Sequence, residues 1–157
     1  KKYDYLFFVD TDVLLPSDAI EKLLNLNQQI TTGVYIGGIM TQNGVKNAPV
    51  LYDFSEKEDY IQLVPLNDVM EDKVFEVAAC GFGCCMIKRE VLEKVKLRYS
   101  EKSKAGEDVL FCRDARKNFG YKTIVNTAVR CTHMGKEEDL TFPAGIANFN
   151  FEYNEVY

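Results

Sequence analysis

Several features of other protein classes are missing from this chain of 157 residues. Its longest apolar runs, such as YLFFV, fall far short of the roughly 20 residues that a membrane-spanning helix needs. It has no long run of Lys or Arg and carries a net charge of −5, which argues against nucleic acid as the main partner. It also has no CxxC pair with a matching second pair, so a zinc site is not expected.

The five cysteines are odd in number, and four of the five lie in apolar stretches. We interpret them as buried free thiols, which are typical of a reducing compartment. A cytoplasmic location is therefore expected, and membrane association would come from a longer protein. With 46% hydrophobic and 27% charged residues, the composition suffices for one core and predicts one domain.

Strand and helix patterns alternate along the chain, which predicts an α/β fold with a mixed sheet. The apolar run 5–9 is typical of a central strand buried on both faces. Further strands are expected over residues 30–38, 74–87, 121–126 and 128–134. Helices are expected after Ser17, over 88–95 and over 107–119, with Gly120 at the end of the last one.

Asp10 and Asp12 follow the first expected strand, in the segment YLFFVDTDVLL. Open α/β sheets bind ligands outside the carboxyl ends of their strands. If the chain stays extended, both carboxylates point to the same side, and such a pair suits a magnesium or manganese ion that also touches a substrate phosphate. The alternative is a plain turn with a helix cap, but Ser17 is better placed to cap the helix.

An Asp-x-Asp motif after an apolar strand occurs in two enzyme classes. In haloacid-dehalogenase-type phosphatases the first Asp is a nucleophile, a role that would fall to Asp10, and the second is a general acid. In GT-A glycosyltransferases the motif binds a divalent metal ion that bridges the diphosphate of a nucleotide sugar. The two aspartates by themselves fit both classes.

The other motifs resemble those of GT-A glycosyltransferases of family 2. Glu107 and Asp108 follow a polar loop and open a helix, whereas the phosphatases have their second acidic motif at the end of a strand. AGEDVLFCRDARKNFGYKTIVN is similar to the family's GED motif with its helix, and VRCTHMG places His133 where the family has a third metal ligand. EVAACGFGCCMIKREVL resembles the family's glycine-containing strand, so the likeness covers most of residues 3–135.

The resemblance implies a role for each acidic residue and for the histidine. Asp12 and His133 would hold Mn²⁺ or Mg²⁺, and Asp10 would lie nearer to the donor ribose or reach the ion through water. Asp108 would be the general base that takes the proton of the acceptor hydroxyl, with inversion at the anomeric carbon. Glu107 would orient the acceptor or the start of the helix.

The resemblance also implies sites for the two substrates. The donor would be a nucleotide-diphosphate sugar and the acceptor a hydroxyl group of a carbohydrate, lipid or protein. Lys136 would reach the leaving phosphates as a flexible charge, although a solvated lysine fits its position equally well. Gly81, Phe82 and Gly83 would let the acceptor approach the backbone, and a β-bulge is the alternative explanation.

Two expectations concern how much of the enzyme this chain contains and how active the chain is by itself. Residues 1–135 would be the C-terminal part of a GT-A domain and residues 136–157 a lid or tail, so that a nucleotide-binding βαβ half would precede them. We therefore expect this chain alone to bind metal weakly and to turn over little. A non-catalytic sugar- or nucleotide-binding module is the remaining alternative.

One physical conflict arises at Asp108. The N-terminus of a helix favours the charged carboxylate and lowers its pKa, which would make Asp108 a weak base. Desolvation has to act in the opposite direction if Asp108 is to accept a proton near neutral pH.

Overall fold

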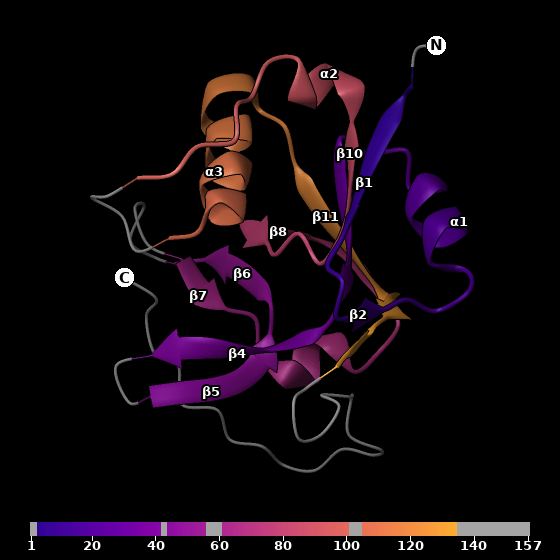
Figure 1. Ribbon diagram of the computed structural model, residues 1–157, viewed down its shortest axis with the longest axis vertical. Helices are drawn as coiled ribbons and strands as arrows, with labels where there is room; N and C mark the ends of the chain where they lie inside the picture. Colours follow the sequence, from indigo (N-terminus) through magenta and orange to yellow (C-terminus); the bar gives the residue numbers. More distant parts are fainter. Residues whose placement is uncertain (1–2, 42–43, 56–60, 101–104, 135–157) are drawn as a thin grey trace.

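The computed structural model describes residues 3–41, 44–55, 61–100 and 105–134. Its centre is a five-stranded mixed sheet (Figure 1). From one side to the other, the strands are β1 (Tyr5–Val9), β10 (Cys84–Lys88), β3 (Ile30–Val34), β11 (Thr123–Arg130) and β8 (Val74–Val77). β3 and β11 pair in parallel and the other neighbours pair antiparallel, so β1, β3 and β11 all run in the same direction. Their carboxyl ends therefore meet at one edge of the sheet.

Three smaller sheets lie in the described ranges of the chain. They pair β4 (Ile36–Thr41) with β5 (Gly44–Pro49), β2 (Val13–Leu14) with β12 (Thr132–His133), and β6 (Leu51–Phe54) with both β7 (Ile61–Leu63) and β9 (Ala79–Cys80). The helical segments there are α1 (Ala19–Leu24), η1 (Leu66–Val69), α2 (Arg89–Leu92) and α3 (Glu107–Phe119).

Different helices cover the two faces of the central sheet, and β10 shows how the sequence arranges this. Cys85 and Ile87 join the larger core, to which α3 contributes Phe111. Cys84 and Met86 join a second core together with residues of α1. Successive strand residues point to opposite faces, so a continuous apolar run is buried on both sides. β10 is thus a true central strand.

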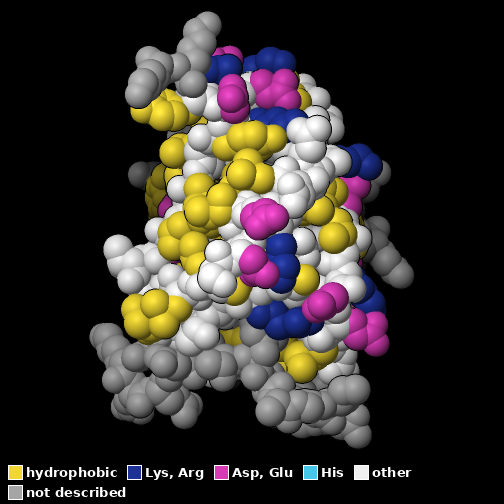
Figure 2. Space-filling model, turned by 90° about the vertical axis from the view of Figure 1, so that its right-hand side faces the viewer, with side chains coloured by type: hydrophobic (Ala, Val, Ile, Leu, Met, Phe, Trp, Pro, Cys, Tyr) yellow, Lys and Arg dark blue, Asp and Glu magenta, His cyan; other side chains and the backbone are white. Residues whose placement is uncertain are grey.

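β1 is the outermost strand of the sheet among the described residues, which makes the prediction of a central strand wrong. Leu6 and Val9 are 47% and 41% exposed. Figure 2, which looks onto the side where α1 and β1 lie, shows hydrophobic side chains among acidic and basic ones on this face. An apolar run predicts a strand, but its position within the sheet depends on which segments pair with it.

Several element boundaries differ from those expected. Asp18, and not Ser17, occupies the position before α1, and its side chain makes no capping hydrogen bond. The two strands expected after Gly120 are one long strand, β11, followed by the two-residue β12. The strand expected over 30–38 is divided between β3 and β4, and the one expected over 74–87 is three strands, β8, β9 and β10, of which β9 lies in a different sheet.

Other expectations from composition are confirmed. All five cysteines are free and buried. The α/β class with a mixed sheet and flanking helices is also observed. No helix among the described residues has the length and apolar character needed to cross a membrane. The segment 136–157, which was expected to form a lid or tail, lies outside the described residues.

Gly120 ends α3 in the left-handed region of backbone conformation, with φ of 69°. Its N–H donates to the carbonyl of Arg116 at 2.8 Å, and the N–H of Tyr121 donates to the carbonyl of Ala115 at 3.2 Å. These bonds satisfy carbonyl groups that have no partner within the helix. A Cβ at position 120 would meet no atom within 4 Å, so only the backbone conformation requires glycine here.

We expect Gly120→Ala to lower the free energy of unfolding by about 1 kcal/mol, because an L-residue pays a steric cost in the left-handed region. Urea denaturation of the purified chain measures the change. Gly120→Asn is the matched control and should lose less, since asparagine tolerates this conformation better. Equal losses in the two variants would contradict the backbone explanation.

Candidate active site

The acidic segment after β1 forms a tight turn at the carboxyl edge of the sheet. The N–H of Asp10 donates to the carbonyl of Gly83 at 3.3 Å, and the N–H of Val13 donates back to the carbonyl of Asp10 at 3.1 Å. The chain therefore turns at Thr11 and Asp12 and does not stay extended. As a result, the two carboxylates have different neighbours: Asp12 faces His133, and Asp10 lies beside Gly83.

His133 reaches Asp12 through the small sheet formed by β2 and β12. In that sheet His133 is paired with Val13, the residue directly after Asp12. The Nε2 atom of His133 lies 3.2 Å from Oδ2 of Asp12. The N–H of Met134 also donates to the carbonyl of Asp12 at 2.7 Å. The two segments are thus held together by their backbones as well as by their side chains.

The tautomer of His133 follows from its second contact. Its Nδ1 lies 3.0 Å from the carbonyl oxygen of Ile36. A carbonyl oxygen can only accept, so Nδ1 carries a hydrogen and donates it. In the neutral ring, Nε2 then presents its lone pair to the carboxylate of Asp12. Two acceptors at this distance require a proton or a cation between them, which makes the pair a candidate metal site.

The distance between the two donor atoms fits a divalent ion. Two adjacent ligands, each about 2.1 Å from an octahedral ion, lie about 3.0 Å apart, close to the 3.2 Å between Nε2 and Oδ2. The side chains of Asp12 and His133 are 54% and 25% exposed, so a ligand can reach both. No group of three or more His, Cys, Asp or Glu suited to a metal occurs in the described part of the chain. Further ligands would have to be water or substrate oxygens, as is usual for Mg²⁺ and Mn²⁺ sites.

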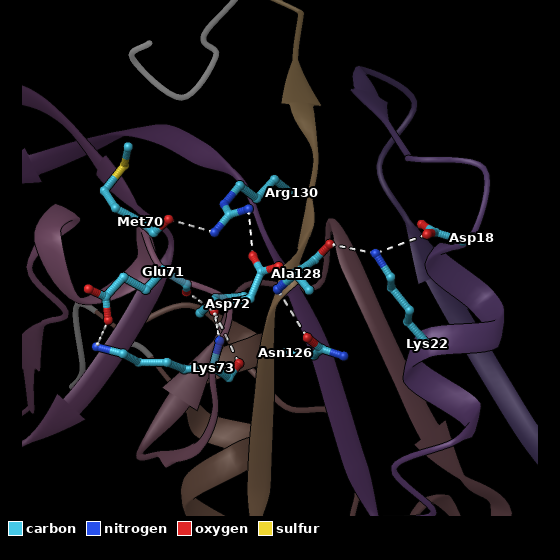
Figure 3. Close-up of polar contacts among 10 residues, drawn as sticks. Asp18, Lys22, Met70, Glu71, Asp72, Lys73, Asn126, Ala128 and Arg130 are labelled. Atoms are coloured by element: carbon cyan, nitrogen blue, oxygen red, sulfur yellow. Dashed lines mark hydrogen bonds and ion pairs between the residues drawn. The ribbon is translucent and has the colours of Figure 1, made fainter. Parts of the chain in front are cut away.

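An irregularity in β11 and the polar contacts drawn in Figure 3 fix the end of this strand, shortly before His133 in the chain. The register of β11 against β3 shifts between Val125 and Arg130, which is typical of a β-bulge. Arg130 donates to the carbonyl of Met70 at 2.7 Å and pairs with Asp72 at 2.8 Å. The hydroxyl of Thr127 accepts the N–H of Lys73 at 2.7 Å. The segment 70–73 thus holds the end of β11 from one side.

Helix α1 holds the same strand from the other side. The ammonium group of Lys22 donates to the carbonyl of Ala128 at 3.1 Å and pairs with Asp18 at 2.9 Å (Figure 3). Beyond these contacts, the N–H of Cys131 donates to the carbonyl of Val34 at 2.7 Å. The bulged part of β11 is therefore fixed on both sides immediately before His133. Sequence reasoning missed these anchors, because no spacing pattern links Lys22 or residues 70–73 to β11.

Asp108 lies in the first turn of α3, half-buried, with its Oδ1 accepting the N–H of Val109 at 2.7 Å. Burial raises the pKa of this carboxyl above its ordinary value, and the charges of Glu107 and Asp10 act in the same direction. The hydrogen bond from Val109 lowers the pKa but does not outweigh desolvation. Desolvation therefore outweighs the opposing effects at the helix start, and the net shift of the Asp108 pKa is upward. Glu107, the residue before it, is exposed.

The segment Gly81–Phe82–Gly83 has a structural explanation that the sequence did not reveal. The ring of Phe82 packs between those of Phe8 at 5.0 Å and Phe111 at 5.6 Å. A Cβ on Gly83 would stand 2.7 Å from Cζ of Tyr35, and one on Gly81 would collide with the Tyr35 hydroxyl. Both glycines leave room for Tyr35. The acceptor-binding role of this segment stays a prediction, and Lys136 lies outside the described residues.

Asp108→Asn should make the protein more stable at pH 7. The pKa of Asp108 is raised in the folded state, so the folded protein binds more protons than the unfolded chain above about pH 4, and stability falls as pH rises through this window. Removing the charge removes that loss, and the gain should vanish below about pH 4. Urea denaturation at pH 7 and pH 4 measures both values.

Asp114 on the same helix provides a control of opposite sign. The guanidinium of Arg98 holds the pKa of the Asp114 carboxyl below its ordinary value. Asp114 therefore stabilises the fold above the unfolded pKa and loses this effect as pH falls. Asp114→Asn should destabilise the protein at pH 7. If both variants shift stability in the same direction, desolvation is not the cause of the raised pKa of Asp108.

Comparison with known proteins identifies relatives of this chain and its family. The chain is 26% identical over 160 residues to poly(ribitol-phosphate) beta-N-acetylglucosaminyltransferase TarP of Staphylococcus aureus (strain N315). The match covers 99% of this chain and 46% of that protein, so the chain spans about half the length of this curated relative.

A likeness of fold comes from the crystal structure of A197 from STIV, with a TM-score of 0.53 at 21% identity. That match covers 95% of this chain and 71% of the other, and it shows a likeness of fold alone. The model of the family described as Glycosyl transferase family 2 matches residues 2–96, which include Asp10, Asp12 and the glycine segment 81–83. Since this match covers more than half of the chain, the protein belongs to glycosyl transferase family 2.

Proposed function

We propose that this chain is the catalytic region of a metal-dependent glycosyltransferase that moves a sugar from a nucleotide-diphosphate donor to an acceptor hydroxyl, with inversion. Membership of the glycosyltransferase family argues against the phosphatase alternative, because the family match includes the Asp10–Asp12 segment. A non-catalytic binding module remains the competing proposal, and the experiments below separate the two.

The observation that carries the proposal is the contact between Asp12 and His133, which are 121 residues apart in the sequence. The Ile36 carbonyl orients the ring so that Nε2 faces the Asp12 carboxylate. Asp12 and His133 would hold Mn²⁺ or Mg²⁺ at this place. A divalent ion held there would supply Lewis-acid stabilisation of the leaving diphosphate.

Asp108 has the environment that a general base needs. A base works best when its pKa approaches the working pH, and burial raises the pKa of Asp108 in that direction. Nearby Asp10 adds a second negative charge that favours the protonated form of Asp108 after it has accepted a proton. We assign Asp108 to the acceptor hydroxyl and the exposed Glu107 to orienting the acceptor.

The donor and acceptor classes are part of the same proposal. Asp10 lies in the same turn as Asp12 and is assigned to the donor ribose. Lys136 follows the His133 segment in sequence and is assigned to the leaving phosphates. The printed name of the relative makes N-acetylglucosamine the first sugar to test, with a carbohydrate, lipid or protein hydroxyl as acceptor.

Nucleotide binding should depend on Mn²⁺ and on the Asp12–His133 pair. Calorimetry and thermal shift with uridine, guanosine and cytidine diphosphates, with and without Mn²⁺, should show metal-dependent stabilisation by one of them. Asp12→Ala and His133→Ala should each weaken that binding by about 100-fold or more, since each removes a direct ligand.

Asp4→Ala is the matched control for these two variants. Asp4 lies just before β1, its side chain is 82% exposed, and its carboxylate is 3.5 Å from Arg89, at the opposite end of the strand from Asp10. This variant should bind as the wild type does. If no nucleoside diphosphate stabilises the full-length protein in the presence of Mn²⁺, the transferase proposal fails.

Turnover should separate catalysis from binding at Asp108. Asp108→Asn keeps the shape of the side chain and an acceptor for the Val109 N–H, so donor binding should be unchanged. Loss of the base should lower kcat by about 100- to 10,000-fold. A normal kcat in this variant would place the base elsewhere, and absence of turnover in the full-length wild-type protein with intact donor binding would favour the binding-module alternative.

A further inference from the structure

Tyr35 is a buried polar residue at the centre of the site that the proposed reaction does not use. It connects β3 to β4 and is only 7% exposed, and its backbone carbonyl accepts the N–H of Val50 at 3.0 Å. Its side chain belongs to the core that α1 and β10 share. The strand before it ends at the same edge of the sheet as β1 and β11, so its ring lies between the segments that carry Asp10 and His133.

The hydroxyl of Tyr35 is joined to the acidic turn through one residue. It accepts the N–H of Gly83 at 3.3 Å, and the carbonyl of Gly83 accepts the N–H of Asp10 at 3.3 Å. A Cβ on Gly83 would stand 2.7 Å from Cζ of Tyr35 and 2.9 Å from Oδ2 of Asp10. The phenol ring and the Asp10 carboxylate are therefore neighbours at the face of Gly83 that a Cβ would occupy.

The ring of Tyr35 also contacts His133. The two ring centroids are 5.8 Å apart and the planes are nearly perpendicular, at 82°. The next residue along the chain, Ile36, accepts the hydrogen of Nδ1. Residues 35 and 36 thus limit the plane of the imidazole and determine which of its nitrogens faces Asp12.

The chemistry of the phenol fits a positioning role. Burial raises its pKa well above the ordinary value of tyrosine, and the nearby Asp10 and Asp108 charges act in the same direction. The hydroxyl therefore stays neutral, so it can keep its contact with the Gly83 N–H without adding a negative charge near the Asp10 carboxylate.

We propose that Tyr35 is a positioning residue that sets the placement of the Asp10–Asp12 turn relative to His133, through Gly83 on one side and through its ring on the other. This assignment rests on the proposed function only where Mn²⁺ affinity is measured, because the placement of His133 can be observed without any ligand. It also explains why positions 81 and 83 are glycine: a Cβ at either one would occupy the space of the Tyr35 side chain.

The single histidine of the chain gives a direct readout. We expect NMR spectra of the metal-free full chain to show His133 with the hydrogen on Nδ1. Tyr35→Leu removes the aromatic ring and should change the chemical shifts of the His133 ring protons, while Tyr35→Phe should leave them close to those of the wild type. Tyr52 is buried to a similar degree on β6, at 8% exposed, and Tyr52→Leu serves as the control that should not change them.

Mn²⁺ affinity, measured by calorimetry at fixed pH, gives the second readout. Removing a group that supports a ligand typically costs 10- to 100-fold in metal affinity, so about a tenfold loss is expected for Tyr35→Leu. Tyr35→Phe should lose less, because it removes only the contact with Gly83. If the wild type binds no Mn²⁺, the proposed function fails, while the spectra of the metal-free protein still test Tyr35.

Unchanged His133 ring signals in a folded Tyr35→Leu variant would overturn the assignment. If that variant does not fold, the Tyr35→Phe variant tests the assignment through backbone amide signals. Loss of the hydroxyl should shift the backbone amide signals of Gly83 and Asp10 beyond the shifts that Tyr52→Phe produces there. Amide signals that stay at their wild-type positions would show that the hydroxyl does not hold the turn.

Discussion

His133 and Asp12 face each other across 3.2 Å although 121 residues separate them, and the arrangement of the whole site depends on this contact. The carbonyl of Ile36 takes the hydrogen of Nδ1, so the remaining nitrogen of the ring points at a carboxylate. Two acceptors in this position repel each other unless a proton or a cation lies between them. A positive charge is therefore stabilising at this site. The backbone contacts that bring the two residues together are present without a bound ion.

The sheet accounts for how so many distant segments meet there. Because β1, β3 and β11 run in the same direction, the residues that follow them lie at one edge of the sheet. The bulge in β11 then redirects the chain, and contacts from α1 and from residues 70–73 hold the redirected part immediately before β12. A regular continuation of β11 would carry His133 along the sheet direction, away from the small β2–β12 pairing that places it beside Asp12.

The charge of Asp108 lowers the stability of the fold. Asp108 is half-buried beside another carboxylate, and burial raises its pKa although it sits at a helix start. Such a group costs stability when it is charged, whereas Asp114 on the same helix is paired with Arg98 and has a lowered pKa. Carboxylates whose pKa is raised by burial cost stability when they are charged. They are typical of functional sites, where stability is given up for reactivity.

The sequence by itself determined the local features of this protein, and only the tertiary structure decided which of them act together. The Gly120 stop correctly marked the end of α3, whereas the single strand expected over 74–87 is three strands, β8, β9 and β10, in two sheets. The resemblance to glycosyltransferases of family 2 is confirmed by the family match over residues 2–96. Periodicity reports whether a residue is buried but not against what, so β1 was wrongly expected at the centre of the sheet. No local pattern could reveal the role of the Ile36 carbonyl, the anchors of β11, the position of Tyr35 or the direction of the Asp108 pKa shift. The physical reason is that each of these depends on neighbours that are distant in sequence.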